Sequence, residues 1–371
     1  MKGRSAAFRA DASQLIGTGH VMRCLTLANQ MRSAGWMTHF LCRDQPGHMG
    51  DALKSAGHQV HLLKQKQPAD NGVKSGATRA DYEAWLGFDQ DDDAAEAVPI
   101  LRAVKPEWLV VDHYALGAYW EATMSDYTRR VMVIDDLANR RHDCDILLDQ
   151  TYGRLVADYD GLVPERTELL CGSQYALLRP EFARLRESRL ERSVSPEVNH
   201  ILVSLGGTDP DNVTGDVLDA LNAARLPSAC RISVVLGQSS LHADAIMARA
   251  NTMAFDCEIL IGVNDMASLM ASCDMAIGAA GSTSWERCCL GVPTIMIVLA
   301  DNQRLIAKNL VNQGAVLALP AGRVMYELQG MIDLLTYDGE RRQLMSQNAA
   351  KVTDGHGVWK AIDRMEQSGD S

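Results

Sequence analysis

A short stretch near the start of the chain combines residue types that could bind an anion and move a proton. It runs from Gly17 to His20, follows a strand-like run at 5–9, and precedes apolar residues at helical spacing as far as Gly35. Glycines let the backbone approach a ligand closely, and the free amides of a helix's first turn attract anionic oxygen, so phosphate is the expected ligand. An imidazole there could act as a base near neutral pH. We therefore take Gly17 and Gly19 as candidate binding residues and His20 as the candidate catalytic base.

The same loop also allows a purely structural interpretation. Gly-x-Gly turns are common, and the third glycine of the dinucleotide fingerprint is absent, because Met22 lies three residues after Gly19. Taken alone, the loop leaves both interpretations open. The rest of the chain has to decide between them.

Composition narrows the class of protein. The chain has 371 residues and 47% hydrophobic residues, which favours two well-packed domains. Its net charge of -11 argues against nucleic-acid or anionic-membrane partners. The nine cysteines include no C-x-x-C pair and are typical of reduced core thiols. No apolar run reaches the length of a membrane span and no signal peptide is evident, so we expect a cytoplasmic protein.

Strand-like and helix-like segments alternate from end to end, which favours parallel sheets with helices on both faces. A charged helical run at 184–192 leads into a linker, and a new strand pattern starts at His200. We predict two Rossmann-like doubly wound α/β domains, 1–190 and 198–371, facing across a cleft. The second domain ends in helices.

Two groups of acidic residues receive a structural interpretation. The segment of about 65–97 has few apolar anchors and carries a run of carboxylates at Asp89, Asp91, Asp92, Asp93 and Glu96, so we expect a solvated, peripheral insertion. Asp135, Asp136 and His142 could suggest a metal site, but they fit strand-end caps equally well. We therefore predict no metal and no cofactor.

The second domain repeats the phosphate pattern of the first. Gly207 and its neighbour Gly206 follow the first strand, Asp209 is expected to cap the next helix, and Pro210 fits that helix's first position. In addition to this capping role, the paired glycines and first helical amides could face a diphosphate. Asn212 lies at the same point.

Two further strand-to-helix loops of the second domain carry polar residues. Thr283 and Glu286 have capping-box spacing, so Glu286 could simply satisfy a backbone amide. Alternatively, its carboxylate could accept hydrogen bonds from both ribose hydroxyls of a nucleotide. Ser282 precedes this helix, and Asn302 in the next loop could present an amide to the ligand, while Asp301 fits a cap.

At this point the sequence resembles a known family, the UDP-2,4-diacetamido-2,4,6-trideoxy-β-L-altropyranose hydrolases of pseudaminic acid biosynthesis, which are similar in fold to GT-B glycosyltransferases. The resemblance spans most of the chain in consistent order. Its motifs are the run 11–20 with its Gly-Thr-Gly-His end, Asp112-His113-Tyr114, 142–148, 158–164, 171–179 and Gly206-Gly207-Thr208-Asp209.

The resemblance implies a role for each matching residue. It makes His20 the catalytic base, Tyr114 and Arg179 the sugar contacts, and Asp11 an orienter of His20 or a ligand of the sugar. The nucleotide-side positions that it implies are Asn212, Glu286 and Asn302. His113 and His142 receive only a structural interpretation.

The implied reaction is attack of water on the anomeric carbon of a UDP-linked sugar, with inversion and release of UDP. Because UDP is a good leaving group, one base is expected to be enough, and helix amides would replace much of the usual acid. The implied partners are the UDP-sugar substrate and the UDP product. Two alternatives stay open: a GT-B glycosyltransferase that uses a UDP-sugar donor, and a nucleotide-sugar binding protein without turnover.

Overall fold

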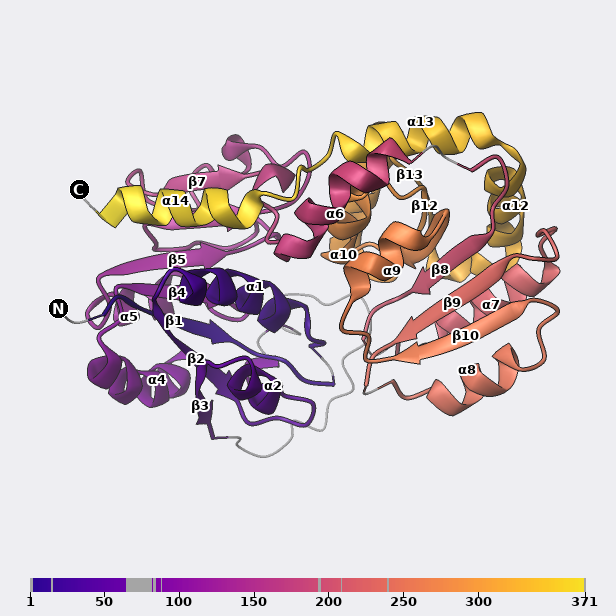
Figure 1. Cartoon of the computed structure of the whole chain (residues 1–371). Helices are drawn as coiled ribbons and strands as arrows, with labels where there is room; N and C mark the ends of the chain where they lie inside the picture. Colours follow the sequence, from indigo (N-terminus) through magenta and orange to yellow (C-terminus); the bar gives the residue numbers. More distant parts are fainter. Residues whose placement is uncertain are drawn as a thin grey trace. The chain divides into compact units, whose positions relative to one another are not determined.

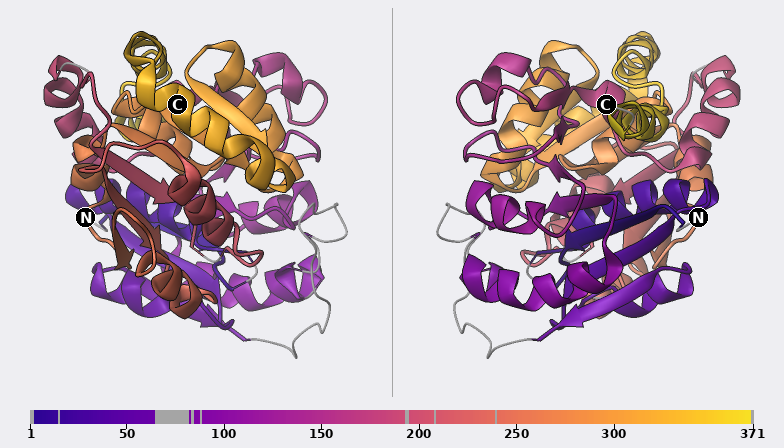
Figure 2. Two further views of the ribbon diagram at one scale, coloured as in Figure 1. Left: turned by 90° about the vertical axis from the view of Figure 1, so that its right-hand side faces the viewer. Right: turned by 90° about the vertical axis from the view of Figure 1, so that its left-hand side faces the viewer.

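The computed structural model describes residues 3–14, 16–64, 82, 85–87, 89–192, 195–207, 209–238 and 240–369 (Figure 1). The chain divides into two compact units, the first formed by Met1–Leu177 with His356–Ser371 and the second by Leu178–Gly355. Each unit is an α/β domain built on one parallel sheet, and the views in Figure 2 show helices on both sides of each sheet. The prediction of two doubly wound α/β domains is confirmed.

The first unit contains a seven-stranded sheet in the order β3-β2-β1-β4-β5-β6-β7. Its strands are β1 (Ser5–Ala10), β2 (Met37–Arg43), β3 (Gln59–Leu63), β4 (Trp108–Asp112), β5 (Arg130–Ile134), β6 (Ile146–Asp149) and β7 (Glu168–Cys171). Its helices are α1 (Gly19–Ser33), α2 (Gly50–Ser55), α4 (Gln90–Val104), α5 (Ala118–Ser125) and α14 (Gly357–Gly369), with short 3-10 turns η1 (Val156–Tyr159) and η2 (Ser173–Tyr175).

The central strand β1 shows why this sheet is covered on both faces. All six of its residues are buried, as expected for a central strand of a parallel sheet. Phe8 points into a core shared with α1 and α14, whereas Ala7 joins the core beneath α4 and α5. Strand order reverses between β1 and β4, so the loops after these two strands meet at the switch point where such sheets bind ligands.

The second unit contains a six-stranded parallel sheet in the order β10-β9-β8-β11-β12-β13. Its strands are β8 (His200–Ser204), β9 (Arg231–Leu236), β10 (Asp256–Ile261), β11 (Met275–Ala279), β12 (Thr294–Val298) and β13 (Val316–Pro320). Its helices are α6 (Pro180–Glu191), α7 (Val213–Ala223), α8 (Ala243–Ala250), α9 (Met266–Ser272), α10 (Thr283–Cys289), α11 (Arg304–Asn312), α12 (Val324–Tyr337) and α13 (Gly339–Ala350), with 3-10 turns η3 (Asp301–Gln303) and η4 (Ala321–Arg323).

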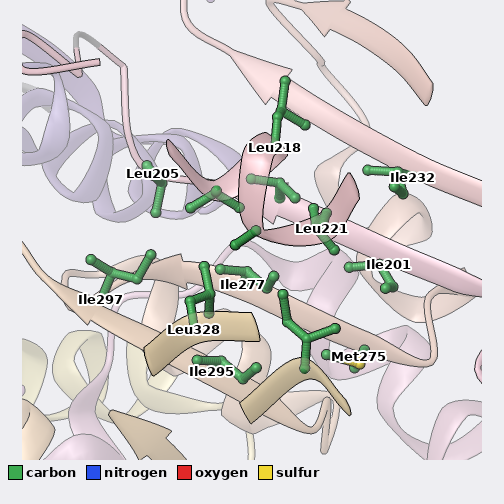
Figure 3. Packing of buried hydrophobic residues seen from close by; sticks show 14 of the residues in the cluster. Ile201, Leu205, Leu218, Leu221, Ile232, Met275, Ile277, Ile295, Ile297 and Leu328 are labelled. Atoms are coloured by element: carbon green, nitrogen blue, oxygen red, sulfur yellow. The ribbon is translucent and has the colours of Figure 1, made fainter. Parts of the chain in front are cut away.

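Branched aliphatic side chains form the main core of the second unit. Figure 3 shows Ile201 of β8, Ile277 of β11 and Ile295 of β12 packed with leucines of α7 and α12. The strand order reverses between β8 and β11. The loops after β8, β11 and β12 therefore lie at one sheet edge and bring together polar residues that are far apart in sequence.

The boundaries of the two units differ from the predicted 1–190 and 198–371 in two places. Helix α6 packs against α9 and α10, so it belongs to the second unit rather than to the end of the first. The last helix, α14, packs against α1 and places Val358 and Met365 in the first unit's core. Because these apolar side chains pack in the core of the first unit, the C-terminal helix belongs to that unit. A division at a single position of the sequence could not predict this.

The acidic segment of 65–97 differs from the expected solvated insertion where the structure describes it. Residues 65–81, 83, 84 and 88 lie outside the described residues, but α4 covers one face of the sheet. Asp89 caps this helix by accepting from the amide of Asp92 at 2.8 Å. Asp93 is completely buried and accepts hydrogen bonds from Arg9. The expectation of a peripheral segment is therefore wrong for the described part of α4.

Helix length and composition also bear on membranes. In the described part of the chain, no helix is both long enough and apolar enough to cross a bilayer.

Candidate active site

The glycine loop of the first unit forms a tight turn before α1. Gly17 adopts a φ of 77°, which favours glycine, and its amide donates to the carbonyl oxygen of Ser13 at 2.9 Å. Helix α1 begins at Gly19 with no acidic side chain in its first turn and no side-chain cap from Thr18. The backbone amides of Gly19 and His20 donate to no described residue. This helix terminus thus keeps the partial positive charge that attracts an anion.

His20 is held by a carboxylate from the neighbouring strand. Its Nδ1 lies 2.6 Å from Oδ1 of Asp112, the last residue of β4, and its side chain is 10% exposed. Nε2 of His20 makes no hydrogen bond to any described residue. Because β1 and β4 are adjacent, the sheet brings this acid and base together although they are separated by 92 positions in the chain.

Arg23 fixes the ionisation of that carboxylate. It donates from Nε to Asp112 Oδ2 at 2.6 Å and from Nη2 to Oδ1 at 2.7 Å. Burial alone would raise the pKa of Asp112, but Arg23 and His20 outweigh this effect and hold the pKa well below its usual range. The carboxylate is therefore charged at neutral pH.

The charge of Asp112 determines the tautomer of His20. An ionised carboxylate only accepts hydrogen bonds, so the 2.6 Å contact requires the proton on Nδ1. The neutral imidazole then has its lone pair on Nε2, the nitrogen without a described partner. Arg23 Nη2 lies 3.3 Å from Nδ1 but does not hydrogen-bond to it, since both atoms carry protons. This arrangement is that of a general base oriented by an acid.

Tyr114 lies against His20 and is part of the same network. The two rings meet edge to face with centres 4.5 Å apart. The Tyr114 hydroxyl donates to Asp136, which also accepts from Nη1 of Arg23 at 2.9 Å. Burial, reinforced by Asp136, raises the pKa of Tyr114 well above its usual value. Tyr114 is therefore a neutral phenol next to the candidate base.

A cavity of about 270 Å³ adjoins Tyr114. It is lined by the start of α5 and the loop after β5, together with the side chains of Tyr82 and Gln90. Tyr114 therefore lies between this cavity and the ring of His20.

Asp11 does not contact His20 but binds other residues of the first unit. It is buried, and its carboxylate accepts from Arg9 at 2.6 and 2.9 Å and from the amide of Arg43 at 2.7 Å. His113 Nε2 also lies 3.3 Å away. Among the described residues, Asp112 and not Asp11 orients His20. Both oxygens of Asp11 already accept from buried donors, so Asp11 does not have the role of orienting His20, whereas its other expected role, as a ligand of the sugar, stays a prediction.

The cluster considered as a metal site has partners within the protein. Asp135 accepts from Arg140 at 2.6 Å and from Tyr159 at 2.9 Å, while Asp136 binds Arg23 and Tyr114. His142 Nδ1 lies 2.7 Å from Glu121 Oε1, in keeping with its structural interpretation. No group of three or more His, Cys, Asp or Glu side chains in the described ranges is arranged to hold a metal ion.

In the second unit, Asp209 occupies the start of α7. Its carboxylate accepts from the amides of Val213 and Thr214 at 2.9 and 2.8 Å, which confirms its capping role. The expectation that these amides face a diphosphate is wrong, because an acidic side chain already satisfies them. Helix α7 begins at Val213, so Pro210 precedes the helix rather than opening it.

The remaining candidates of this loop lie close to a neighbouring one. Gly207 packs so tightly against the loop after β9 that a Cβ on Gly237 would lie 2.1 Å from the Gly207 carbonyl oxygen. Asn212 precedes α7 with a φ of 54°, and its Oδ1 is buried with no hydrogen-bond partner among the described residues. Asn212 therefore combines a left-handed backbone with an unsatisfied side-chain oxygen, features of the kind found at ligand sites, and Gly207 lies where the two loops approach closely.

The loop after β11 offers donors that α7 lacks. Ser282 precedes α10 without a side-chain cap, and the backbone amides of Ser282 and Thr283 donate to no described residue. The Thr283 hydroxyl accepts from Arg287 at 3.1 Å instead of capping the helix. No backbone amide in the described ranges donates to Glu286, so the capping-box alternative has no support. Burial raises the pKa of Glu286, while Arg179 opposes this effect.

Arg179 and Asn302 complete the residues predicted for this site. Arg179 Nη2 lies 3.7 Å from Glu286 Oε1, within the second unit. Asn302 is exposed in η3, next to Asp301, which pairs with Arg304 at 2.7 Å. The candidates thus form two groups: His20 and Tyr114 with the glycine loop in the first unit, and Arg179, Gly207, Asn212, Ser282, Glu286 and Asn302 in the second.

Sequence reasoning missed the residues that orient His20. Arg23 lies three positions after His20 on α1, so helical spacing places both side chains on one face. In the sequence, Asp112 stands out only as part of a strand-end motif. A search for basic residues three positions from the histidine, matched with acids at neighbouring strand ends, would have found the pair.

The fold defines a class of protein, the GT-B fold, which the chain shares with solved glycosyltransferase structures. MurG of Acinetobacter baumannii superposes with a TM-score of 0.65 at 16% identity, covering 98% of this chain and 99% of that one. HepE of Anabaena, solved in complex with UDP-glucose, gives a TM-score of 0.57 at 13% identity and 98% coverage of each chain. At these identities the likeness concerns the fold.

Sequence comparison leads to particular relatives. Residues 200–359 match the family model of the glycosyltransferase family 28 C-terminal domain. UDP-2,4-diacetamido-2,4,6-trideoxy-beta-L-altropyranose hydrolase of Campylobacter jejuni is 25% identical over 307 residues, which cover 83% of this chain and 96% of the relative. The resemblance predicted from the motifs is therefore confirmed.

Proposed function

We propose that the chain is a hydrolase that removes UDP from a UDP-linked 2,4-diacetamido-2,4,6-trideoxy sugar in pseudaminic acid biosynthesis. The similarity to the Campylobacter jejuni hydrolase over most of both chains supports the substrate class. The observation that carries the reaction is the His20–Asp112 pair, in which a buried carboxylate leaves Nε2 of the histidine as the basic nitrogen.

In this proposal, His20 activates water. Nε2 removes a proton from water as the water oxygen forms a bond to the anomeric carbon. The bond between that carbon and the diphosphate oxygen breaks, and its electron pair leaves with UDP. Asp112 stabilises the imidazolium that forms, as in other acid-oriented histidine bases. Attack opposite to the leaving group inverts the anomeric centre.

The second unit is proposed to hold the nucleotide. The unpartnered amides of Ser282 and Thr283 suit the diphosphate, and Glu286 suits the ribose hydroxyls. Gly207, Asn212 and Asn302 lie in neighbouring loops of the same sheet edge. These protein donors would neutralise charge on the leaving group, so we propose that hydrolysis needs no divalent metal.

The test is release of UDP in the absence of any acceptor. The wild-type protein should release UDP from the diacetamido UDP-sugar in oxygen-18 water with a chelator present, and the label should enter the free sugar and not UDP. Label in the phosphate would indicate attack at phosphorus and overturn the proposal. Loss of activity with the chelator would overturn its metal-independent part.

A glycosyltransferase is the second candidate, and the match to the family 28 C-terminal domain favours it. A transferase would use the same base to activate an acceptor hydroxyl instead of water. It would release UDP only when an acceptor is added. A binding protein without turnover would release none under either condition.

A further inference from the structure

Arg179 lies among the second-unit residues that are proposed to hold the nucleotide. Three different elements of this unit contact its side chain. It precedes α6 as the N-cap residue, and its guanidinium carbon lies 5.3 Å from the centre of the Phe182 ring. Nη1 donates to the carbonyl oxygen of Asn264, in the loop after β10, at 3.1 Å. Nη2 faces Glu286 of α10. These contacts fix the guanidinium beside one carboxylate.

Glu286 has an unusual environment for a carboxylate. Its side chain is only 16% exposed, yet no described residue donates a hydrogen bond to it. Arg179 is the cation paired with it among the described residues, at 3.7 Å, which is too long for a hydrogen bond. Arg287 on the same helix directs its guanidinium to the Ala279 carbonyl at 2.6 Å, and its charge lowers the pKa of Glu286 less than that of Arg179 does, while Glu181 of α6 raises it.

We propose that Arg179 is a positioning residue for the nucleotide, which keeps the Glu286 carboxylate ionised and in place to accept hydrogen bonds from both ribose hydroxyls. This inference rests on the proposed function. It assigns Arg179 to the nucleoside end of the ligand, whereas the resemblance assigns it to the sugar.

The ionisation of Glu286 depends on two opposing effects, the burial of its side chain and the positive charge of Arg179. Burial favours the neutral carboxyl and raises the pKa of Glu286, and the guanidinium of Arg179 opposes this. A carboxylate accepts from two hydroxyls, whereas a protonated carboxyl keeps a hydrogen of its own and accepts less well. UDP affinity should therefore fall as the pH drops through the pKa of Glu286. Without Arg179, that fall should occur at higher pH.

The experiment compares UDP with 2′-deoxy-UDP, which lacks one of the two hydroxyls. Calorimetric titration of the full-length wild-type protein should show that UDP binds at least about tenfold more tightly than 2′-deoxy-UDP. This difference is expected for the loss of one hydrogen bond to a charged group. In Arg179→Met the two affinities should approach each other, and the acidic fall in UDP affinity should move to higher pH. Arg179→Lys should restore part of the ratio.

Three further variants sharpen the result. Arg179→Gln retains a donor for Asn264 without the charge, so it should behave like Arg179→Met. Glu286→Gln should remove the fall in UDP affinity at acidic pH. Arg323→Met is the matched control, because Arg323 pairs with Glu327 on an exposed turn of the same unit, and it should bind both nucleotides as the wild type does.

The outcomes separate this inference from the proposed function. If the Met and Gln variants keep the wild-type ratio and pH profile but turn over the UDP-sugar more slowly at saturation, Arg179 contacts the sugar and the inference is wrong. If the wild-type protein binds neither nucleotide, the proposed function itself fails.

Discussion

The two loop groups that hold the candidate site residues differ in how their charged side chains are paired. In the first unit, the switch point between β1 and β4 is filled with buried charges that bind one another, and His20 is fixed at the edge of this network. In the second unit, Glu286 stands largely buried with only a long ion pair to Arg179. A side chain that moves a proton needs a fixed orientation, whereas one that accepts ligand hydroxyls needs free acceptor capacity.

The first unit extends this network to the opposite face of its sheet. Arg9 of β1 binds both Asp11 and Asp93, and Arg43 of β2 binds Asp93 as well. Glu96 accepts from Arg43 at 3.1 Å. These charges lie directly behind the strand ends that present the candidate site. We infer that they hold the strand ends in register.

Replacement of the base should have the largest effect. His20→Gln should lower the turnover of UDP-sugar by about a hundredfold to ten-thousandfold, the usual cost of losing a general base. The affinity for UDP should be unchanged, because His20 is not among the nucleotide contacts. Steady-state kinetics and calorimetry measure the two effects separately.

Asp112→Asn is the matched variant for that experiment. It keeps the shape of the orienting side chain, but its amide can favour the wrong tautomer of His20, so turnover should fall while UDP still binds. Near wild-type turnover in His20→Gln would remove the histidine from the mechanism.

Removal of a charge from the network should have a large effect on stability. Asp93→Ala leaves Arg9 and Arg43 buried with fewer acceptors, so the free energy of unfolding should fall by about 3–5 kcal/mol. Chemical denaturation measures this change. Asp91→Ala, which removes an exposed bond to Tyr119, is the control and should cost less than about 1 kcal/mol. Equal losses in both variants would show that Asp93 has no special role.

Replacement of Glu286 should weaken UDP binding but have little effect on stability, the reverse of what we expect for Asp93. Glu286→Ala should weaken UDP binding by about tenfold to a hundredfold, the range for hydrogen bonds to a charged group. The free energy of unfolding should change by no more than about 1–2 kcal/mol, since no described amide depends on this carboxylate. Calorimetry and thermal unfolding test the two halves. A drop in stability with unchanged affinity would instead make Glu286 a structural residue.

The smallest expected effect is the contribution of Asp149, at the end of β6, to the pH dependence of stability. Burial raises its pKa to about 6, although Arg154 opposes this. The folded protein therefore holds a proton that the unfolded chain, with a pKa of about 3.9, has already released. The stabilisation from this group is complete below about pH 4 and is lost as the pH rises through 6.

Asp149→Asn should remove that contribution. Between pH 4 and 6.5, its free energy of unfolding should decline less steeply with pH than that of the wild type, as followed by urea denaturation at each pH. Identical slopes would show that Asp149 is ionised throughout this range.

Sequence pattern alone determined the architecture. Buried strands such as β8 and β12 appear as mainly apolar runs, and turn-forming glycines or polar residues follow them, so two parallel α/β sheets could be predicted. The loops that could carry catalytic or binding residues could be located as well, because the carboxyl ends of the parallel strands of one sheet lie at the same edge. Cysteine and charge content narrowed the class further. All of these signals are local or compositional.

Tertiary structure decided which polar residues are free and which are already bound. Asp11 has the same appearance in sequence as Asp112 and Glu286, since each lies at or near a loop at the sheet edge. Only the fold shows that Asp11 accepts from the backbone amide of Arg43, that Asp112 orients His20, and that Glu286 retains acceptor capacity. The physical reason is that hydrogen-bond partners across a parallel sheet lie tens of residues apart, so no local pattern specifies them.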